Sequence, residues 1–465
     1  MKSILLSAGL IVLMSNCTSK YNDNIETVLD GVEDKRGDLE AVLEHYVLPT
    51  DSLKRKAAYF LVENFPEDQV QTIDKQLMIE NIELAFEAWK KPWAKQLNFD
   101  EFKELVLPFN LERDSTGTFW RKRFMKEYAF VEDSIKFYPD RPMLLAACII
   151  VDHALRKKYS FEFDRDQTNL LDLNGWERVR KSECSDMAKL TNHIMHSIGI
   201  PTAIEFTPQW GNTNYRHFWN VLFLDNKYLP FMGTEHTPAL YKVELETEYN
   251  FNKKRPKVFR QKYEYNPQSL AYVANEPIPS IFQSTHIVDI SKERIPTKSI
   301  TMPVPDSIDK SYVYLAVSSR TTWLPAAWGK VENEKVTFQD IRKGVMFVPT
   351  TFDARKDTLI PFDYPFILKR SGELHQFKPQ LNNTEQVTCL KKHPRDETNW
   401  IKLGDTYQLY YWDFYKWRLV GTKTATERKV VFDKVPKNSV LLLRNITRGR
   451  KERVFVYQDK KQVFL

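Results

Sequence analysis

Residues 182–231 constrain the fold more than any other part of this chain, because they predict a helix that is followed by a β-hairpin. The helix is indicated by apolar residues at helical spacing after Cys184, namely Met187, Leu190, Ile194 and Ile198. It is expected to stop at Gly199-Ile200-Pro201, a helix-ending sequence. Cys184 therefore lies in the first turn of a predicted helix of about four turns.

The hairpin begins at His217. Residues 217–223 are rich in aromatic and β-branched side chains, which favour a strand. Asp225-Asn226 supplies a turn, and residues 228–231 would return as the second strand. The chain thus has a cysteine at a helix start and a histidine at a strand start within one short helix–hairpin segment.

A thiol at a helix start, followed by an imidazole, suits nucleophilic catalysis. Unpaired N–H groups and the positive end of the helix dipole stabilise a thiolate, so we expect a lowered pKa for Cys184. The same N–H groups could hold an oxyanion. His217 would serve as the base, and a third group would orient its ring.

At these residues the chain resembles the transglutaminase-like superfamily, which shares the papain-like thiol fold. The matching pieces are Cys184 at its helix start, the helix exit at residues 198–203, and the sequence His217-Phe218-Trp219-Asn220. The resemblance implies cleavage of amide bonds through an acyl-thioester, in a multidomain bacterial envelope protein.

The third member of the site is expected near the end of the second hairpin strand. The family usually has an Asp there, and the corresponding residue of this chain is Met232. Glu235, three residues farther on, is the predicted substitute. Asp225 is a weaker candidate because its turn lies at the far end of the strand from His217, and Asn220 points to the opposite face from His217.

Both central residues also have an ordinary structural interpretation. A single Cys in a helix is usually a small buried hydrophobe, and a single His is more often structural than catalytic. Two functions therefore stay open. One is a thiol amide hydrolase, a peptidase or amidase, that acts on protein, peptide or glycopeptide substrates. The other is an inactive transglutaminase-like scaffold whose β domains bind a surface glycan or protein.

The first residues predict export and lipid anchoring. Lys2 is followed by a mainly apolar run from Ile4 to Met14, which is too short for a membrane span but typical of a signal-peptide core. Met14-Ser15-Asn16-Cys17 resembles a bacterial lipobox, which implies a signal peptide at residues 1–17 and a lipidated Cys17. We therefore expect a cell-envelope location, periplasmic or on the surface, with a lipid anchor to the membrane.

The remaining cysteines and the histidines do not predict a metal or another cofactor. Of four cysteines, only Cys148 and Cys389 lack a predicted role, and the apolar run around Cys148 should bury it. A disulfide scaffold is therefore not expected. The sequence has neither a CxxC pair nor an HExxH motif. His193 and His196 have a spacing that could serve a metal, but we interpret them as partly exposed helix surface.

Length, charge and residue texture predict a multidomain α+β protein. A chain of 465 residues exceeds a single core, and its net charge of +7 is spread throughout, so no nucleic-acid groove is expected. Helical spacing dominates a predicted N-terminal region, and short strands dominate the end of the chain. The predicted division is a helical region at 18–130, a papain-like, transglutaminase-like α+β domain at 131–275, and β-sandwich-like domains at 290–378 and 385–465.

Several tryptophans and one loop have a possible part in ligand binding. Trp176 or Trp210 could line the substrate cleft or assist the oxyanion, although core or rim packing is the default interpretation for both. The polar loop 208–214 is a natural place for substrate selection. Four tryptophans of the predicted β domains could stack on sugars, although core packing is the default interpretation. These are Trp323, Trp328, Trp412 and Trp417.

Overall fold

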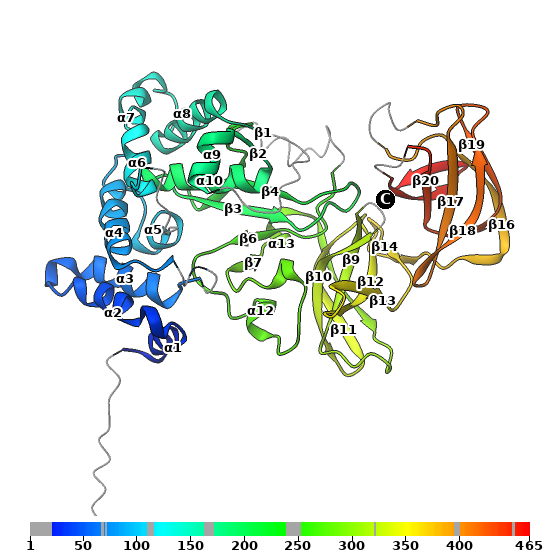
Figure 1. Cartoon of the computed structure of the whole chain (residues 1–465), viewed down its shortest axis with the longest axis horizontal. Helices are drawn as coiled ribbons and strands as arrows, with labels where there is room; N and C mark the ends of the chain where they lie inside the picture. Colours follow the sequence, from blue (N-terminus) through cyan, green and yellow to red (C-terminus); the bar gives the residue numbers. More distant parts are fainter. Residues whose placement is uncertain are drawn as a thin grey trace, which may run out of the picture. The chain divides into compact units, whose positions relative to one another are not determined.

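The computed structural model confirms a multidomain α+β architecture with a helical N-terminal region and a strand-rich C-terminal region (Figure 1). It describes residues 21–66, 69, 72–108, 116–161, 172–238, 253–319, 322–394, 400–448 and 452–465. The chain divides into two compact units, residues 1–82 and 83–465. The predicted lipidation site, Cys17, lies outside the described residues.

The first unit is built from amphipathic helices. They are α1 (Asp23–Gly31), α2 (Arg36–His45), α3 (Ser52–Glu63) and the beginning of α4 (Lys75–Trp89). The side chain of Asn22 caps α1 by accepting the N–H of Ile25, which satisfies one of the free donors of the first turn. Fully buried Leu39, Val42 and Leu61 contribute to the apolar interior of this unit.

Helices also dominate the start of the second unit. They are α5 (Phe99–Leu105), α6 (Trp120–Glu127), α7 (Val131–Ser134), α8 (Met143–Lys158) and α9 (Leu173–Val179). Asn98 and Glu101 form a capping box at the start of α5, and Trp89 stacks on Phe102 with ring centroids 4.2 Å apart. Short strands β1 (Ser160–Phe161) and β2 (Lys181–Ser182) pair in parallel immediately before the cysteine helix.

A five-stranded antiparallel sheet, in the order β5-β4-β3-β6-β7, carries the predicted site. Its strands are β3 (Thr202–Thr207), β4 (His217–Leu224), β5 (Lys227–Phe231), β6 (Phe259–Gln261) and β7 (Ile287–Asp289). Helix α10 (Cys184–Ser197) packs on β3 and β4 (Figure 1). Strand β7 joins the sheet beyond residue 275, where the predicted thiol domain ends. It is followed by α13 (Ser291–Arg294), and α12 (Leu270–Val273) precedes it.

Gly199 explains why α10 ends where it does. Its φ is +79°, a left-handed conformation that favours glycine, and a Cβ there would lie 2.3 Å from the carbonyl oxygen of Ala88. The chain therefore leaves the helix and enters β3 in close contact with the end of α4.

An eight-stranded antiparallel sheet follows, in the order β15-β14-β12-β9-β10-β11-β8, with β13 paired to β12. The strands are β8 (Thr297–Pro303), β9 (Tyr312–Ser319), β10 (Thr322–Glu332), β11 (Lys335–Arg342), β12 (Met346–Asp353), β13 (Thr358–Pro361), β14 (Phe366–Leu368) and β15 (Leu374–Gln376). Val313, Leu315, Val317, Phe338 and Phe347 are fully buried in its core. Val313, Leu315 and Val317 alternate along β9 and so face this core, while Tyr314 and Ala316 between them are buried on the other face of the strand.

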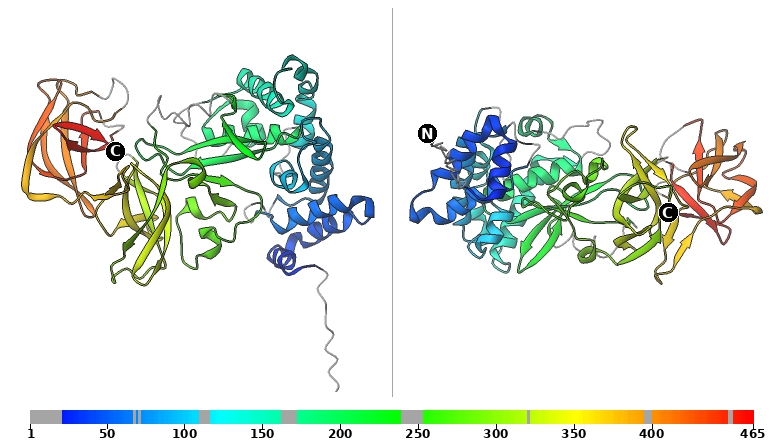
Figure 2. Two further views of the ribbon diagram at one scale, coloured as in Figure 1. Left: turned by 180° about the vertical axis from the view of Figure 1, so that it is seen from behind. Right: turned by 90° about the horizontal axis from the view of Figure 1, so that it is seen from below.

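The last part of the chain forms a strand pair and a five-stranded sheet, in the order β18-β17-β20-β21-β22. The pair is β16 (Gln380–Cys389) with β19 (Val430–Lys437). The sheet contains β17 (Thr406–Asp413), β18 (Lys416–Thr424), β20 (Leu441–Asn445), β21 (Val454–Gln458) and β22 (Lys461–Phe464). Figure 2 shows that helices are concentrated in the blue-to-green half of the chain, while the yellow and red parts consist mainly of β-strands. Buried Leu409, Phe432 and Leu443 form part of this core.

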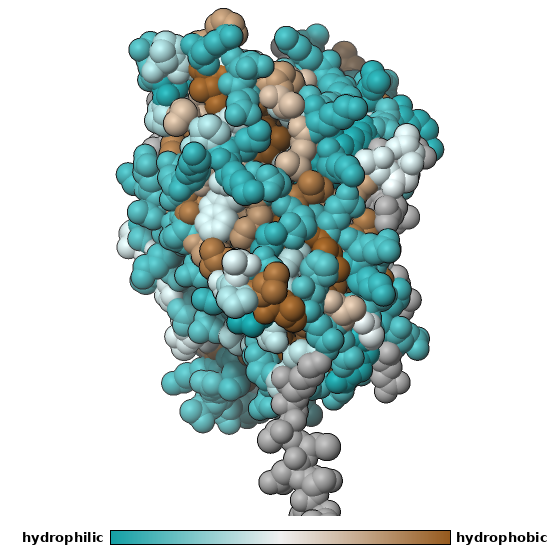
Figure 3. Space-filling view, turned by 90° about the vertical axis from the view of Figure 1, so that its left-hand side faces the viewer, coloured by the Kyte–Doolittle hydropathy of each residue, from teal (hydrophilic) through white to brown (hydrophobic). Residues whose placement is uncertain are grey.

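The surface visible in Figure 3 is mostly hydrophilic, and its apolar side chains form separate patches. Within the residues that the structure describes, no helix combines the length and apolar character needed to cross a membrane.

Candidate active site

Cys184 is the first residue of α10, as predicted. Glu183 has extended backbone angles at the N-cap, and its carbonyl accepts the N–H of Met187 as the first helical hydrogen bond. The side chains of Ser182 and Asp186 are buried and hydrogen-bonded to each other across the helix start. These contacts hold the first turn of α10, which carries the thiol, in place.

The structure brings Cys184 to the beginning of β4. The backbone N–H of Phe218, the residue after His217, donates to the Cys184 sulfur. A second link joins the preceding residues, because Arg216 forms an ion pair of 3.2 Å with Glu183. The start of α10 and the start of β4, which the sequence predicted to carry the two halves of the site, are therefore in contact.

The pKa of Cys184 differs from the prediction. Burial raises it from 9.0 to about 11, since only 8% of the residue is exposed. The N–H groups of Phe218 and Ser185 and the charge of Arg216 act in the opposite direction, and Glu183 adds to the increase. The expectation of a thiolate stabilised at the helix start was wrong because the loss of water around the sulfur outweighs these donors.

His217 lies in an aromatic and cationic environment. Its ring stacks with Trp210 at 5.4 Å and with Trp219 at 5.7 Å between centroids. Lys253 lies over the Trp210 ring and Arg255 over the Trp219 ring. Although part of the residue is accessible, desolvation of the imidazole lowers its pKa to about 3, and the two cations contribute to the decrease. His217 is therefore neutral at pH 7.

The register of the hairpin explains the environment at position 232. Asn220 pairs with Phe231, and the chain then turns, with the N–H of Met232 donating to the carbonyl of His236. Met232 is 1% exposed, so an apolar side chain is buried where the family resemblance implies an Asp. Glu235 is partly exposed in the same turn, where its N–H donates to the Met232 carbonyl.

Asn220 and Asp225 have structural roles. The side-chain amide of Asn220 donates to the carbonyl of Ala188 and to the side chain of Asn192, so it ties the hairpin to α10. Asp225 and Asn226 have φ values of 51° and 58°, as a tight hairpin turn requires. The turn joins the ends of β4 and β5 that lie farthest from His217, as expected.

Sequence reasoning missed a buried carboxylate behind the turn. Asp152 on α8 is fully buried and forms an ion pair with Arg156 one turn later. The backbone N–H of Thr234 donates to it, which anchors the turn that contains Glu235. Burial raises the pKa of Asp152. A single acidic residue in the apolar run of α8 was the signal that could have identified it.

No family model and no curated protein matches the sequence. The chain is similar in part to the crystal structure, at 1.9 Å, of a proposed cysteine protease from Cytophaga hutchinsonii, with 12% identity and a TM-score of 0.18. The similarity covers 25% of this chain and 41% of the other. This chain therefore spans less than half of that protein, and neither family nor activity follows from the comparison.

The histidine pair on α10 is not exposed surface. His193 and His196 are 9% and 6% exposed, and their rings bond to the carbonyls of Lys189 and Thr202. Burial lowers their pKa values to about 3 and about 4. The described residues contain no cluster of three or more His, Cys, Asp or Glu side chains that could hold a metal. The expected surface position was wrong because α6 and α9 cover this face, with Trp120 and Trp176 against His193.

The loop before His217, which the sequence presented as a place for substrate selection, is largely buried. Residues 208–211, 213 and 214 are buried, and only Asn212 is partly exposed within the range 208–214. Trp210 from this loop contacts the His217 ring, whereas Trp176 is 1% exposed and contacts His193 on α10. The loop therefore supports the imidazole and has little surface with which to select a substrate.

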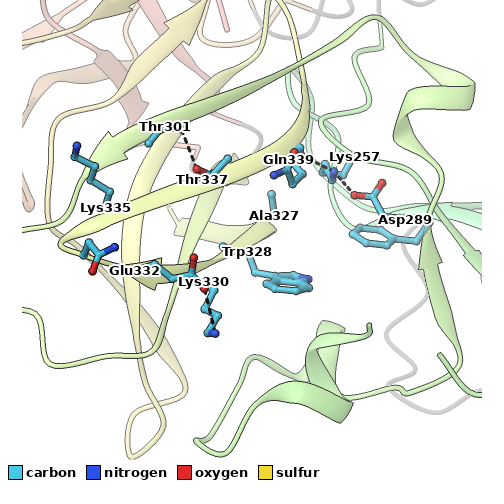
Figure 4. Close-up of a pocket in the computed structure, with 13 residues that line it drawn as sticks. Lys257, Asp289, Thr301, Ala327, Trp328, Lys330, Glu332, Lys335, Thr337 and Gln339 are labelled. Atoms are coloured by element: carbon cyan, nitrogen blue, oxygen red, sulfur yellow. Dashed lines mark hydrogen bonds and ion pairs between the residues drawn. The ribbon is translucent and has the colours of Figure 1, made fainter. Parts of the chain in front are cut away.

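The four tryptophans of the strand-rich region divide into two groups. Trp323, Trp412 and Trp417 contact one another, with centroids between 5.0 and 6.4 Å apart, which agrees with core packing. Trp328 instead lines a hollow of about 550 Å³ bounded by β6, β7, β8, β10 and β11 (Figure 4). Thr301 and Thr337 are hydrogen-bonded to each other on its wall.

The described cysteines other than Cys184 have no visible part in the site. Cys148 is fully buried, as predicted, and so is Cys389. Burial raises the pKa of both thiols well above the usual value. Both thiols should therefore be slow to react, and they give an internal reference for Cys184.

Proposed function

We propose that this protein is a thiol amide hydrolase in which Cys184 is the nucleophile and His217 the general base. The observation that supports this most directly is the hydrogen bond from the Phe218 N–H to the Cys184 sulfur, which holds the thiol beside the first residues of β4. The ion pair between Glu183 and Arg216 supports the same approach of the two segments. Protein, peptide or glycopeptide amides are the proposed substrates.

The resting groups define how the reaction would start. A neutral imidazole accepts a proton, and the pKa of His217, about 3, keeps it neutral at pH 7. The Cys184 sulfur would attack the amide carbon while its proton passes to His217, which then returns the proton to the leaving amine. Water would hydrolyse the thioester with His217 again as the base. Glu235 stays the proposed orienting group for the imidazole.

The proposed cellular setting comes from the sequence. We infer export by residues 1–17 and lipidation of Cys17, which would hold the protein at the envelope membrane. Metabolic labelling with a palmitate analogue tests this directly in the native bacterial host. Label in the wild-type protein and its loss in Cys17→Ala are expected, whereas equal labelling of both proteins would contradict the proposal.

Acyl-enzyme trapping tests the catalytic proposal. The protein without residues 1–17 is incubated with a p-nitrophenyl ester of an acylated amino acid, and the acylated residue is located by mass spectrometry. We expect a thioester at Cys184 in wild-type protein and none there in Cys184→Ala. Because a general base contributes about 10²- to 10⁴-fold, His217→Ala should slow acylation by at least about 100-fold.

Cys148 and Cys389 serve as matched thiols within the same molecule. Their burial predicts little acylation in any variant. Equal rates at Cys184 in wild type and His217→Ala would contradict the base role of His217. Acylation that is no faster at Cys184 than at Cys148 or Cys389 would contradict the enzyme itself.

The hollow beside Trp328 favours a second candidate function, that of a glycan-binding scaffold with an inactive thiol domain. Its volume is within the usual range for ligand pockets, and its lining combines an indole ring with hydroxyl, amide and charged groups (Figure 4). Aromatic and polar groups of this kind can hold the apolar face and the hydroxyls of a sugar. Glycan-array binding that is lost in Trp328→Ala and kept in Cys184→Ala would favour the scaffold, and binding unaffected by Trp328→Ala would exclude this hollow.

A further inference from the structure

The loop before His217, residues 208–216, has an internal hydrogen-bond framework. The Trp210 N–H donates to the carbonyl of Tyr215 at 3.0 Å, and the side chain of Gln209 donates to the carbonyl of Thr213 at 2.9 Å. The Trp210 ring is 6% exposed and stacks on the imidazole. The position of Trp210, and with it one side of the His217 environment, therefore depends on this loop.

Arg453 holds the loop from the far end of the sequence. It precedes β21 and is fully buried, and it donates to the carbonyls of Gly211 at 2.5 Å and Thr213 at 3.4 Å. The same guanidinium donates to Ser318 at the end of β9 and to the backbone oxygen of Leu465. All four of these acceptors are backbone oxygens. One side chain thus joins the loop, the eight-stranded sheet and the C-terminal strands.

A second set of contacts holds the same loop from the other side. The N–H of Gly211 donates to the carbonyl of Lys254 at 2.6 Å, and the N–H of Lys254 donates to the Asn212 side chain. The ammonium of Lys254 reaches the carbonyl of Gly344. A Cβ at position 211 would lie 2.8 Å from Val345, so the close approach requires glycine. The loop is therefore fixed against the strand-rich region and not only against its own sheet.

We propose that Arg453 is a positioning residue for His217: by binding the carbonyls of Gly211 and Thr213 it holds Trp210 against the imidazole and couples the docking of the C-terminal strands to the thiol site. This inference deepens the proposed function, since it assigns regulation of the same site to a residue that touches neither Cys184 nor the ring. Loss of the docked arrangement would release the loop and admit water to His217.

The groups around His217 determine how its pKa would change if the loop were released. Desolvation is the main reason for the low pKa of His217, and Lys253 and Arg255 add to it. Both cations lie over the indole rings of Trp210 and Trp219. Water that enters when Trp210 moves would stabilise the imidazolium, so the pKa should rise toward its usual value of 6.5. Other charged or titratable groups at this end of the sheet are Cys184, Glu183 and Arg216.

The test is an NMR titration of the full-length protein with ¹³C-labelled histidine, in which His217→Gln assigns the signal. Wild-type His217 should show no titration between pH 5 and 8. Arg453→Met should bring its titration into this range, an upward shift of at least about two pH units from the wild-type pKa of about 3. Arg453→Lys keeps a cation but fewer donors, and it should give a smaller shift.

Arg121 offers a matched control. It is also fully buried and donates to backbone carbonyls, those of His196, Val106, Leu107 and Pro108. Arg121→Met therefore removes a comparable buried guanidinium without releasing Trp210, and His217 should stay untitrated. The proposal is overturned if Arg453→Met folds and leaves the His217 titration unchanged, or if Arg121→Met shifts it equally.

A second variant covers the case in which Arg453→Met does not fold. Gly211→Ala displaces the loop from Val345 and leaves Arg453 in place, and the same upward shift of the His217 titration is expected. An unchanged titration in folded Gly211→Ala would then overturn the proposal. This readout does not depend on catalysis. If Cys184 forms no acyl-enzyme but Arg453→Met shifts His217, the proposed function fails and the positioning role stands.

Discussion

Glu205→Ala is expected to be one of the most destabilising single substitutions in the sheet that carries the site. Glu205 lies on β3, and its carboxylate is fully buried. It accepts hydrogen bonds from Arg260 and Arg294 and from the indole N–H of Trp219. Because Trp219 also stacks on His217, this carboxylate supports both the sheet and the imidazole.

The magnitude follows from what the substitution would leave behind. The side chains of Arg260 and Arg294 are only 9% and 16% exposed, so both cations would lose their buried counter-charge. Removing one partner of a buried ion pair costs about 3–5 kcal/mol of unfolding free energy. Leaving the Trp219 N–H without its acceptor adds about 1 kcal/mol.

Glu293 provides the matched control. It forms an ion pair with the same Arg260 at 3.2 Å, but its side chain is 57% exposed. An exposed pair contributes about 0–1 kcal/mol, so Glu293→Ala should have a small effect on the same unit. The two carboxylates share the cation Arg260, so the comparison shows what the burial of Glu205 and its further contacts with Arg294 and Trp219 add.

Urea unfolding followed by tryptophan fluorescence is the assay. All 11 tryptophans lie at or beyond residue 89, so the signal reports the unit of residues 83–465. We expect a large decrease in the unfolding midpoint for Glu205→Ala and almost none for Glu293→Ala. If the two midpoints shift equally, the buried carboxylate does not have the role assigned to it.

Two further substitutions test the surroundings of the sheet. Glu104 accepts the N–H of Tyr263, yet burial raises the pKa of its carboxyl from 4.5 to about 7. The folded state therefore holds the proton more tightly than the unfolded state. The resulting contribution to the free energy of unfolding is complete below pH 4.5 and is lost as the pH rises through 7. Glu104→Gln should flatten the pH dependence of unfolding free energy in this window, by at most about 3 kcal/mol, in urea titrations at each pH; parallel curves for the two proteins would contradict this. Gly233→Ala places a Cβ 2.0 Å from the Thr191 hydroxyl and should cost about 1–3 kcal/mol in thermal unfolding, whereas Gly421→Ala meets only an ordinary contact and should be tolerated. Equal melting temperatures for these two variants would refute the packing argument.

The sequence predicted the elements of the site well because their signals are local. Apolar spacing from Met187 to Ile198 and the Gly-x-Pro exit determine α10, and the turn at Asp225-Asn226 determines the hairpin. The meeting of Cys184 with the start of β4 follows from packing one amphipathic helix on the strands that come after it. A family resemblance at these residues pointed to the same arrangement.

The burial of the site residues could not be predicted in the same way, because it depends on parts of the chain that are distant in sequence. Arg453, 240 residues beyond Thr213, holds the loop that the sequence presented as a polar substrate-binding segment. Arg121 binds the His196 carbonyl across 75 positions and helps to enclose a helix face that was expected to be exposed. Local spacing identifies which residues share a face but not which remote segment covers it.

Burial also determines how the proposed reaction can begin. With pKa values of about 11 for Cys184 and about 3 for His217, proton transfer in the resting site is unfavourable by about 11 kcal/mol. Two opposite unit charges, even as close as 4 Å, would gain only about 4 kcal/mol from their attraction at an effective dielectric constant of 20. The resting pair is therefore neutral, and a nucleophile can form only when attack on the carbonyl accompanies proton transfer or when water enters. Because desolvation is the leading cause of both shifts, water would lower the pKa of the thiol and raise that of the imidazole together. An active enzyme must bring about one of these two changes, whereas an inactive scaffold needs neither.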